Sequence, residues 1–174
     1  FRALRVERDG GIGDVKDTLE VDFANEFIGG ASISYGCVQE EIKFSLCPEL
    51  NVTSLICEKM EMQEAIQITG GEQFSKYTGY AFSLGYGGDH VDTNKDADGN
   101  VTTKTVAIDA LIFHGIAPQF DRAMIDRELV KAYIGFYEPG DNLEPVSSGN
   151  WGCGAFGGDK RLKSILQWIA ASAV

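Results

Sequence analysis

Basic residues are scarce in this sequence. Its 174 residues include 15 lysines and arginines against 26 aspartates and glutamates, which gives a formal net charge of −11 at pH 7. Non-specific nucleic-acid binding depends on Lys and Arg side chains that neutralise phosphates, so direct DNA binding is not expected. A ligand that carries phosphate would have to be held by local dipoles such as main-chain amides.

Long apolar runs are absent as well, because no stretch approaches the roughly 20 residues that cross a bilayer. We expect no association with a membrane, and no secretory signal is visible. The two histidines, His90 and His114, lie far from each other and from any cysteine at metal-ligand spacing, so neither a metal nor a cofactor is expected. The four cysteines match no CxxC or zinc pattern and predict reduced thiols in an intracellular protein: Cys37, Cys47, Cys57 and Cys153.

One acidic segment resembles the first half of a calcium-binding loop. Asn94, Asp96 and Asp98 alternate and Gly99 follows them. The twelfth position counted from Asn94 is Thr105, which has no carboxylate to complete a calcium site. No helical pattern flanks the segment either. A solvated acidic hairpin loop is the expected structure.

Glycine is abundant, with 21 residues, and many of them are clustered. The clusters fall at residues 29–30, 70–71, 85–88 and 149–158. Clustered glycines indicate backbone that turns sharply or comes close to another group. We interpret them as a first indication of a ligand site.

Strand and helix patterns alternate along the chain. Apolar and polar residues alternate as in strands, weakly at 2–7 and clearly at 19–23, 65–69 and 105–111. Helical spacing appears at 38–46, before Pro48, then at 120–136, and again from the N-cap Asp159 onward. There is no repeat and no low-complexity linker. This order predicts one α/β domain with helices packed on both faces of a sheet.

The segment from Val21 to Leu50 contains the richest chemistry. Asp22 and Asn25 lie at the end of a predicted strand, Gly29-Gly30-Ala31 form a flexible turn, and Gln39-Glu40-Glu41 begin a helix. Two adjacent carboxylates suit glycoside hydrolysis, which needs a proton donor for the departing oxygen. A bound diphosphate nearby should raise the pKa of one of them. The alternative is that both glutamates only complement the helix dipole.

The order of these motifs resembles the poly(ADP-ribose) glycohydrolase family. The signature is a glycine turn, about seven intervening residues and Gln-Glu-Glu. Further similar segments follow in order to the end of the chain: Ile68-Thr69-Gly70, Tyr77-Thr78-Gly79-Tyr80, Val106 to Leu111, Arg127-Glu128-Leu129, and Gly149 to Asp159. Several long motifs in series are far more specific than a single glycine pair.

The resemblance implies a macrodomain-like, three-layer α/β/α fold with a mixed sheet over residues 1–174, incomplete at both ends. It implies hydrolysis of ribose–ribose O-glycosidic bonds in poly(ADP-ribose), alone or on ADP-ribosylated proteins, by an intracellular monomer. The DNA damage response in the nucleus or cytoplasm is the implied setting. Glu41 would be the general acid and base, through an oxocarbenium-like transition state, and Glu40 would hold ribose hydroxyls.

The resemblance also implies how the substrate is bound. Asp22 supports catalysis, Asn25 orients the substrate, and Gln39 and Tyr77 contact adenine. By the residues alone, Tyr77 fits an ordinary core tyrosine and the second glycine segment a tight strand-to-helix turn. The remaining implied contacts lie in three glycine-containing segments: Ile12 and Gly13; Gly29, Gly30 and Ala31; and Asn150, Trp151, Gly152, Cys153, Gly154, Ala155 and Phe156.

Three positions depart from the family pattern. Gly13 replaces an acidic residue that grips adenine, Ala31 replaces the third glycine of the signature, and the chain ends at Val174, where family members continue into another strand. The departures favour an alternative, a catalytically impaired module that binds ADP-ribose. A more distant alternative is a protein-interaction domain without a nucleotide site.

Overall fold

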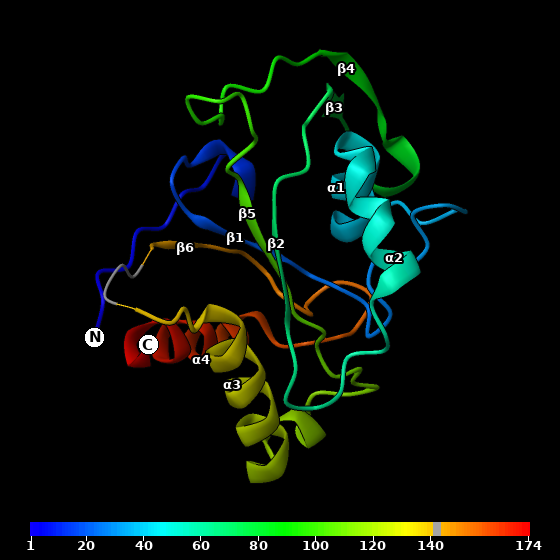
Figure 1. Ribbon diagram of the computed structural model, residues 1–174. Helices are drawn as coiled ribbons and strands as arrows, with labels where there is room; N and C mark the ends of the chain where they lie inside the picture. The colour runs from blue at the N-terminus through cyan, green and yellow to red at the C-terminus, as the bar shows by residue number, and fades with distance from the viewer. Residues whose placement is uncertain (141–143) are drawn as a thin grey trace.

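The computed structural model describes residues 1–140 and 144–174, and a four-stranded mixed sheet forms its centre (Figure 1). The strand order is β2-β5-β1-β6. β1 (Leu19–Asp22) pairs in parallel with β5 (Lys104–Ala107) and with β6 (Val146–Ser147), while β2 (Ile66–Thr69) pairs antiparallel with β5. The predicted mixed sheet is confirmed.

Helices cover both faces of this sheet. α1 (Gln39–Leu46) and the short α2 (Thr53–Ile56) lie on one side, and α3 (Arg122–Phe136) and α4 (Lys160–Ala173) pack together on the other (Figure 1). The result is the predicted three-layer α/β/α arrangement. Short 3₁₀ turns span Ile12–Asp14, Pro48–Val52, Ala81–Ser83 and Ala117–Phe120.

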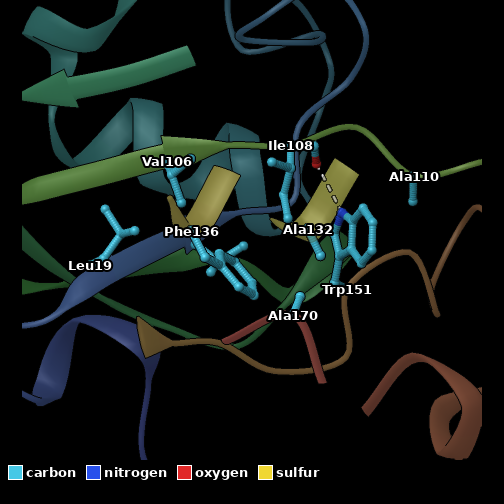
Figure 2. Close-up of a cluster of buried hydrophobic side chains, with 9 residues drawn as sticks. Leu19, Val106, Ile108, Ala110, Ala132, Phe136, Trp151 and Ala170 are labelled. Carbon is cyan, nitrogen blue, oxygen red and sulfur yellow. Dashed lines mark hydrogen bonds between the residues drawn. The ribbon is translucent and has the colours of Figure 1, made fainter. Parts of the chain in front are cut away.

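The alternation of side chains along the strands produces two separate cores. On the α3–α4 side, Leu19 and Val21 meet Val106 and Ile108, and Trp151 closes the cluster (Figure 2). On the α1 side, a second cluster forms around Phe44, Leu50 and Ala107. Because β1 alternates, its polar residues Glu20 and Asp22 are directed to the α1 side, where the glutamates of α1 lie.

The helix boundaries follow the predicted signals. The Asp159 carboxylate accepts hydrogen bonds from the backbone N–H groups of Arg161 (3.0 Å) and Leu162 (2.9 Å), which is the expected N-cap of α4. α1 ends at Leu46, two residues before Pro48, as predicted.

Several elements differ from the prediction. Residues 2–7 form no strand: the N-terminal segment packs along α4, where the Trp168 indole N–H donates to the Arg2 carbonyl at 2.9 Å. β5 ends at Ala107, although the apolar pattern continues to Leu111. The hairpin of β3 (Ser75–Thr78) and β4 (Gly85–Asp89) was not predicted, because its glycines interrupt the alternation.

The acidic segment is the expected hairpin loop. Lys95 and Val101 form an antiparallel bridge, and the Asp96 carboxylate accepts from the backbone N–H groups of Asp98 (2.9 Å) and Asn100 (2.8 Å). Among residues 1–140 and 144–174 there is no group of three His, Cys, Asp or Glu side chains placed to hold a metal ion. None of the helices in these same ranges has the length and apolar character needed to span a membrane.

Candidate active site

The glutamates of α1 are held by the turn that precedes the helix, which we call the first glycine loop (residues 27–36). The Glu40 carboxylate accepts from the backbone N–H groups of Asn25 (2.9 Å) and Gly29 (2.6 Å). The Glu41 carboxylate accepts from those of Ala31 (3.2 Å) and Val38 (3.0 Å). Both carboxyl groups are therefore fixed in position before any ligand arrives.

The glycines of this loop are required by the close approach of the glutamates. Gly30 has a φ of +49°, and a Cβ added there would lie 2.6 Å from Glu41 Oε1 and 2.7 Å from Glu40 Oε2. Gly29 has a φ of +90° and would clash with the Ser54 hydroxyl in the same way. Ala31 is not in the left-handed region, so its departure from the family signature places no strain on the loop.

The contacts of the first glycine loop differ from the expectation that its amides bind phosphate. The N–H groups of Gly29 and Ala31 donate to Glu40 and Glu41, and that of Gly30 donates to the Phe27 carbonyl at 3.1 Å. The anions bound by this turn are thus the protein's own carboxylates. The Gly29 and Ala31 amides of the first glycine loop therefore hold the two glutamates of α1.

Asp22 lies behind the two glutamates, and neither of its side-chain oxygens has a hydrogen-bond partner among the described residues. Its exposed fraction is 0%, against 2% for Glu40 and 8% for Glu41, so Glu41 is the most accessible of the three. Burial raises the pKa of Asp22 to about 7, opposed by the Lys43 ammonium and assisted by the Glu41 carboxylate. Burial, with Asp22 close by, raises the pKa of Glu40 to about 8. Asp22 and Glu40 therefore hold protons to higher pH than exposed carboxyl groups do.

Replacing Asp22 with Asn should remove a pH-dependent loss of stability. A carboxyl with a raised pKa binds more protons in the folded than in the unfolded chain, so the free energy of unfolding falls as pH rises from the unfolded pKa to the folded one. For Asp22 this window runs from 3.8 to about 7. Between about pH 5 and pH 8, the wild type should therefore lose about 2 kcal/mol more stability than Asp22→Asn. Urea unfolding at the two pH values measures the difference.

The control for this experiment is Asp98→Asn, at an exposed position of the hairpin loop. Its stability should follow the wild type at both pH values. Parallel curves for the wild type and Asp22→Asn would contradict a raised pKa at Asp22.

An open cleft of about 450 Å³ adjoins the start of α1 and brings together the residues expected at the adenine end. Ile12, Gly13, Gln39 and Tyr77 all line it. The Gln39 side chain accepts from the backbone N–H of Phe23 at 2.7 Å and donates to the Val21 carbonyl at 3.3 Å. Gln39 thus ties α1 to the end of β1 while it lines the cleft.

The cleft also contains residues that the sequence did not identify. Glu20 and Lys43 form an ion pair in its wall, and Tyr80 lines it beside Tyr77. A Cβ added at Gly13 would lie 3.5 Å from the Glu20 carboxylate. Where the family carries an acidic side chain, this chain therefore has the Glu20 carboxylate close by. Glu20 could have been predicted from the alternation of β1, which directs Glu20 and Asp22 to the same face of the sheet.

A second turn, the second glycine loop (residues 149–158), lies at the ends of the same strands (Figure 1). A Cβ added at Gly149 would lie 3.5 Å from the ring of Phe23, the residue after β1. The Trp151 indole N–H donates to the carbonyl of Ile108, just after β5, at 2.9 Å (Figure 2). Both glycine loops therefore lie at the carboxyl ends of β1 and β5, where open α/β sheets bind ligands.

The second glycine loop has free main-chain donors. The N–H groups of Gly152, Gly154, Ala155 and Phe156 donate to no acceptor in the parts of the chain that the structure describes. The loop leads into the N-terminus of α4 at Lys160. Free amides in a turn before a helix form an anion-binding concavity. In the first glycine loop the N–H groups of Gly29, Gly30 and Gly36 have acceptors, whereas those of Gly152 and Gly154 in this loop have none among the described residues.

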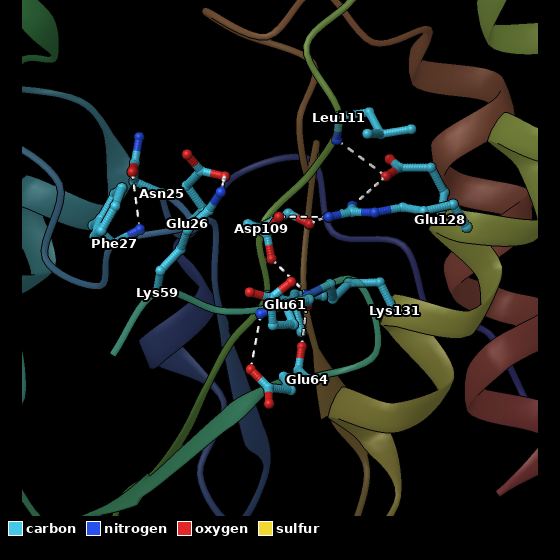
Figure 3. A network of polar contacts seen from close by, with 12 residues as sticks. Asn25, Glu26, Phe27, Lys59, Glu61, Glu64, Asp109, Leu111, Glu128 and Lys131 are labelled. Atoms are coloured by element: carbon cyan, nitrogen blue, oxygen red, sulfur yellow. Dashed lines mark hydrogen bonds and ion pairs between the residues drawn. The ribbon is translucent and has the colours of Figure 1, made fainter. Parts of the chain in front are cut away.

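The remaining predicted site residues lie around these loops in different roles. Asn25 accepts from the backbone N–H of Phe27 at 3.0 Å (Figure 3), and Asn150 is exposed. Trp151 is fully buried and anchors the second glycine loop from below. Burial raises the pKa of the Cys153 thiol to about 11, which fits a small residue between glycines and not a nucleophile. Within residues 1–140 and 144–174, the Glu41 carboxylate accepts from the N–H groups of Ala31 and Val38 and from none in the second glycine loop.

A mixed sheet between two helical layers, with glycine loops at its strand ends, defines this chain as a domain of the macrodomain fold. It belongs to the poly(ADP-ribose) glycohydrolase family, because the family model for "Poly (ADP-ribose) glycohydrolase (PARG), Macro domain fold" matches residues 1–174.

Curated relatives support this assignment. Poly(ADP-ribose) glycohydrolase 1 of Caenorhabditis elegans is 44% identical over 174 residues, which cover 92% of this chain and 22% of the relative. Probable poly(ADP-ribose) glycohydrolase 2 of Arabidopsis thaliana is 36% identical over 98% of this chain and 40% of the relative. The chain therefore spans well under half the length of these relatives.

Proposed function

We propose that this domain hydrolyses the ribose–ribose O-glycosidic bonds of poly(ADP-ribose) and releases ADP-ribose. The observation that carries the proposal is the pair of buried glutamates, fixed by main-chain amides at the edge of the sheet that also carries a loop with free amides. Family membership and the names of the relatives support the substrate class.

In the proposed reaction Glu41 acts on the bond that breaks. Protonated Glu41 gives its proton to the leaving ribose oxygen as the C–O bond opens, and the sugar carbon becomes oxocarbenium-like. Water then attacks that carbon, and the Glu41 carboxylate takes the proton from the water. The net change is the addition of one water molecule. Glu41 suits this role because it is the most accessible of the three carboxyl groups.

The neighbouring groups have supporting roles in this proposal. Glu40 binds ribose hydroxyls and holds the first glycine loop, while Asp22 acts through its neighbours, since its side chain is fully buried. Gln39 and Tyr77 bind the adenine end in the cleft. The amides of Gly154, Ala155 and Phe156 bind the diphosphate. This division lets a protein of net charge −11 bind an anion without surface lysines or arginines.

The direct test is incubation of the purified chain with poly(ADP-ribose) and chromatography of the products. We expect free ADP-ribose to accumulate, and we expect added ADP-ribose to raise the melting temperature. Stabilisation by ADP-ribose without release from the polymer would favour the second candidate, an ADP-ribose-binding module. The observation that favours that candidate is Gly13, which offers no side chain to the cleft. Neither release nor stabilisation would contradict both candidates.

A further inference from the structure

A buried cluster of five charged side chains lies between α3, α4 and the end of β5 (Figure 3). Its members are Asp109, Arg127, Glu128, Lys131 and Lys163, which we call the charged cluster. All five are buried or nearly so, with side-chain exposed fractions between 0% and 9%. The proposed reaction uses none of them, although burying so many charges is costly.

Two of the three cations join structural elements. Arg127 donates to the Asp109 carbonyl at 2.7 Å and pairs with its carboxylate at 2.5 Å. Lys131 pairs with Asp109 at 2.7 Å and donates to the carbonyls of Glu61 (2.6 Å) and Glu64 (2.7 Å), which lie before β2 (Figure 3). These contacts attach α3 to the sheet and to the chain that enters β2.

Lys163 has a different environment, because its side chain ends beneath the second glycine loop. A Cβ added at Gly152 would lie 3.2 Å from Lys163 Nζ, and one added at Gly158 would lie 3.2 Å from Lys163 Cε. The ammonium also lies 3.8 Å from the centre of the Trp151 ring, which is part of the loop. Its one charged partner is Glu128, among the residues that the structure describes. Lys163 is the cation of the charged cluster that touches the loop with free amides.

The charge balance of the cluster favours an anion above this loop. Three cations face two carboxylates, so one positive charge is left without an equivalent negative partner. Burial, with Arg127 close by, lowers the pKa of Lys163 to about 7, and Asp109 opposes this shift. An anion over the loop would return Lys163 toward its charged form. Such an interaction is stronger away from water than on the surface, since the surrounding medium screens it less.

We propose that Lys163 is a positioning residue for phosphate, a buried cation that strengthens anion binding by the second glycine loop from below. This inference rests on the proposed function, since it takes the diphosphate of ADP-ribose as the anion. Loop amides contribute only partial charges, and in a protein this acidic the surrounding field repels phosphate. Lys163 adds an ionisable cation that lies beneath the loop and never reaches the surface.

Two variants and two ligands test the inference in the intact chain. The double variant Glu128→Gln/Lys163→Met removes Lys163 together with its partner carboxylate, and Arg127 and Lys131 both keep Asp109 as a partner, so the fold should survive. We expect it to bind ADP-ribose about tenfold more weakly than the wild type, which corresponds to about 1.4 kcal/mol. Adenosine, which has no phosphate, should bind both proteins equally. Calorimetry with both ligands gives the four affinities.

The single variant Glu128→Gln provides a test that does not depend on the double variant. It keeps an oxygen for the Leu111 N–H, which donates to Glu128 at 3.0 Å, and it removes the carboxylate partner of Lys163 while Arg127 keeps Asp109. ADP-ribose should then bind about threefold more tightly, with adenosine unchanged. Equal losses for both ligands in the double variant, or no gain in the single variant, would overturn the inference. If wild-type protein binds no ADP-ribose, the proposed function fails first and the inference with it.

Discussion

Glu41→Gln should lower the turnover of poly(ADP-ribose) by about a thousandfold, within the range that a general acid contributes. The amide has nearly the shape of the carboxyl group, yet it cannot deliver a proton to the leaving oxygen or take one from water. Affinity for ADP-ribose should stay within about threefold of the wild type, because in the proposed complex other residues contact the diphosphate and adenine. Release of ADP-ribose from the polymer and calorimetry measure the two effects.

Glu41→Gln also lowers the stability of the fold, and this effect must be separated from the loss of turnover. The Glu41 carboxylate accepts from Ala31 N–H and Val38 N–H, and a Gln has one oxygen, so one of the two hydrogen bonds is lost. That loss costs about 1 kcal/mol of stability, which a melting curve detects and which cannot account for a thousandfold change in rate. Glu58→Gln, at an exposed position, is the matched control and should keep full activity. Normal turnover by Glu41→Gln would refute the assignment.

The sequence predicted the parts of the fold that depend on local signals. β1 has a clear alternation of side chains, α1 ends just before a proline, and α4 begins at an aspartate N-cap. The predicted positions of these three elements therefore agree with the structure. The β3–β4 hairpin could not be predicted in this way. Its pairing includes a register shift between Lys76 and Tyr77, and three glycines leave no alternation of side chains to detect.

The candidate site was predictable as a list of residues and not as a set of contacts. The motif order indicated Glu40 and Glu41, but only the fold shows that the first glycine loop binds these carboxylates. Lys163 lies in an amphipathic helix, where a lysine ordinarily faces water. Its burial under the second glycine loop depends on the contact of α4 with α3, which no local pattern encodes.

Gly30→Ala should disturb both glutamates of the site with a single methyl group. The added Cβ would lie 2.6 Å from Glu41 Oε1 and 2.7 Å from Glu40 Oε2, so both carboxyl groups would have to move. A displacement of about 1 Å in a catalytic group costs on the order of a hundredfold in rate. We therefore expect polymer hydrolysis to fall at least that far, measured by initial rates at saturating substrate.

The left-handed backbone of Gly30 adds a loss of stability that is unrelated to the glutamates, and a control variant must account for it. Ala at a φ of +49° destabilises the fold by about 1 kcal/mol whatever lies nearby. Gly99 has a φ of +88° with nothing within 4 Å of an added Cβ, so Gly99→Ala carries the backbone strain without a clash. Gly30→Ala should lower the melting temperature at least as much as Gly99→Ala, while Gly99→Ala alone keeps normal turnover. Equal activity in both would mean that the contact between the first glycine loop and the glutamates does not position them for catalysis.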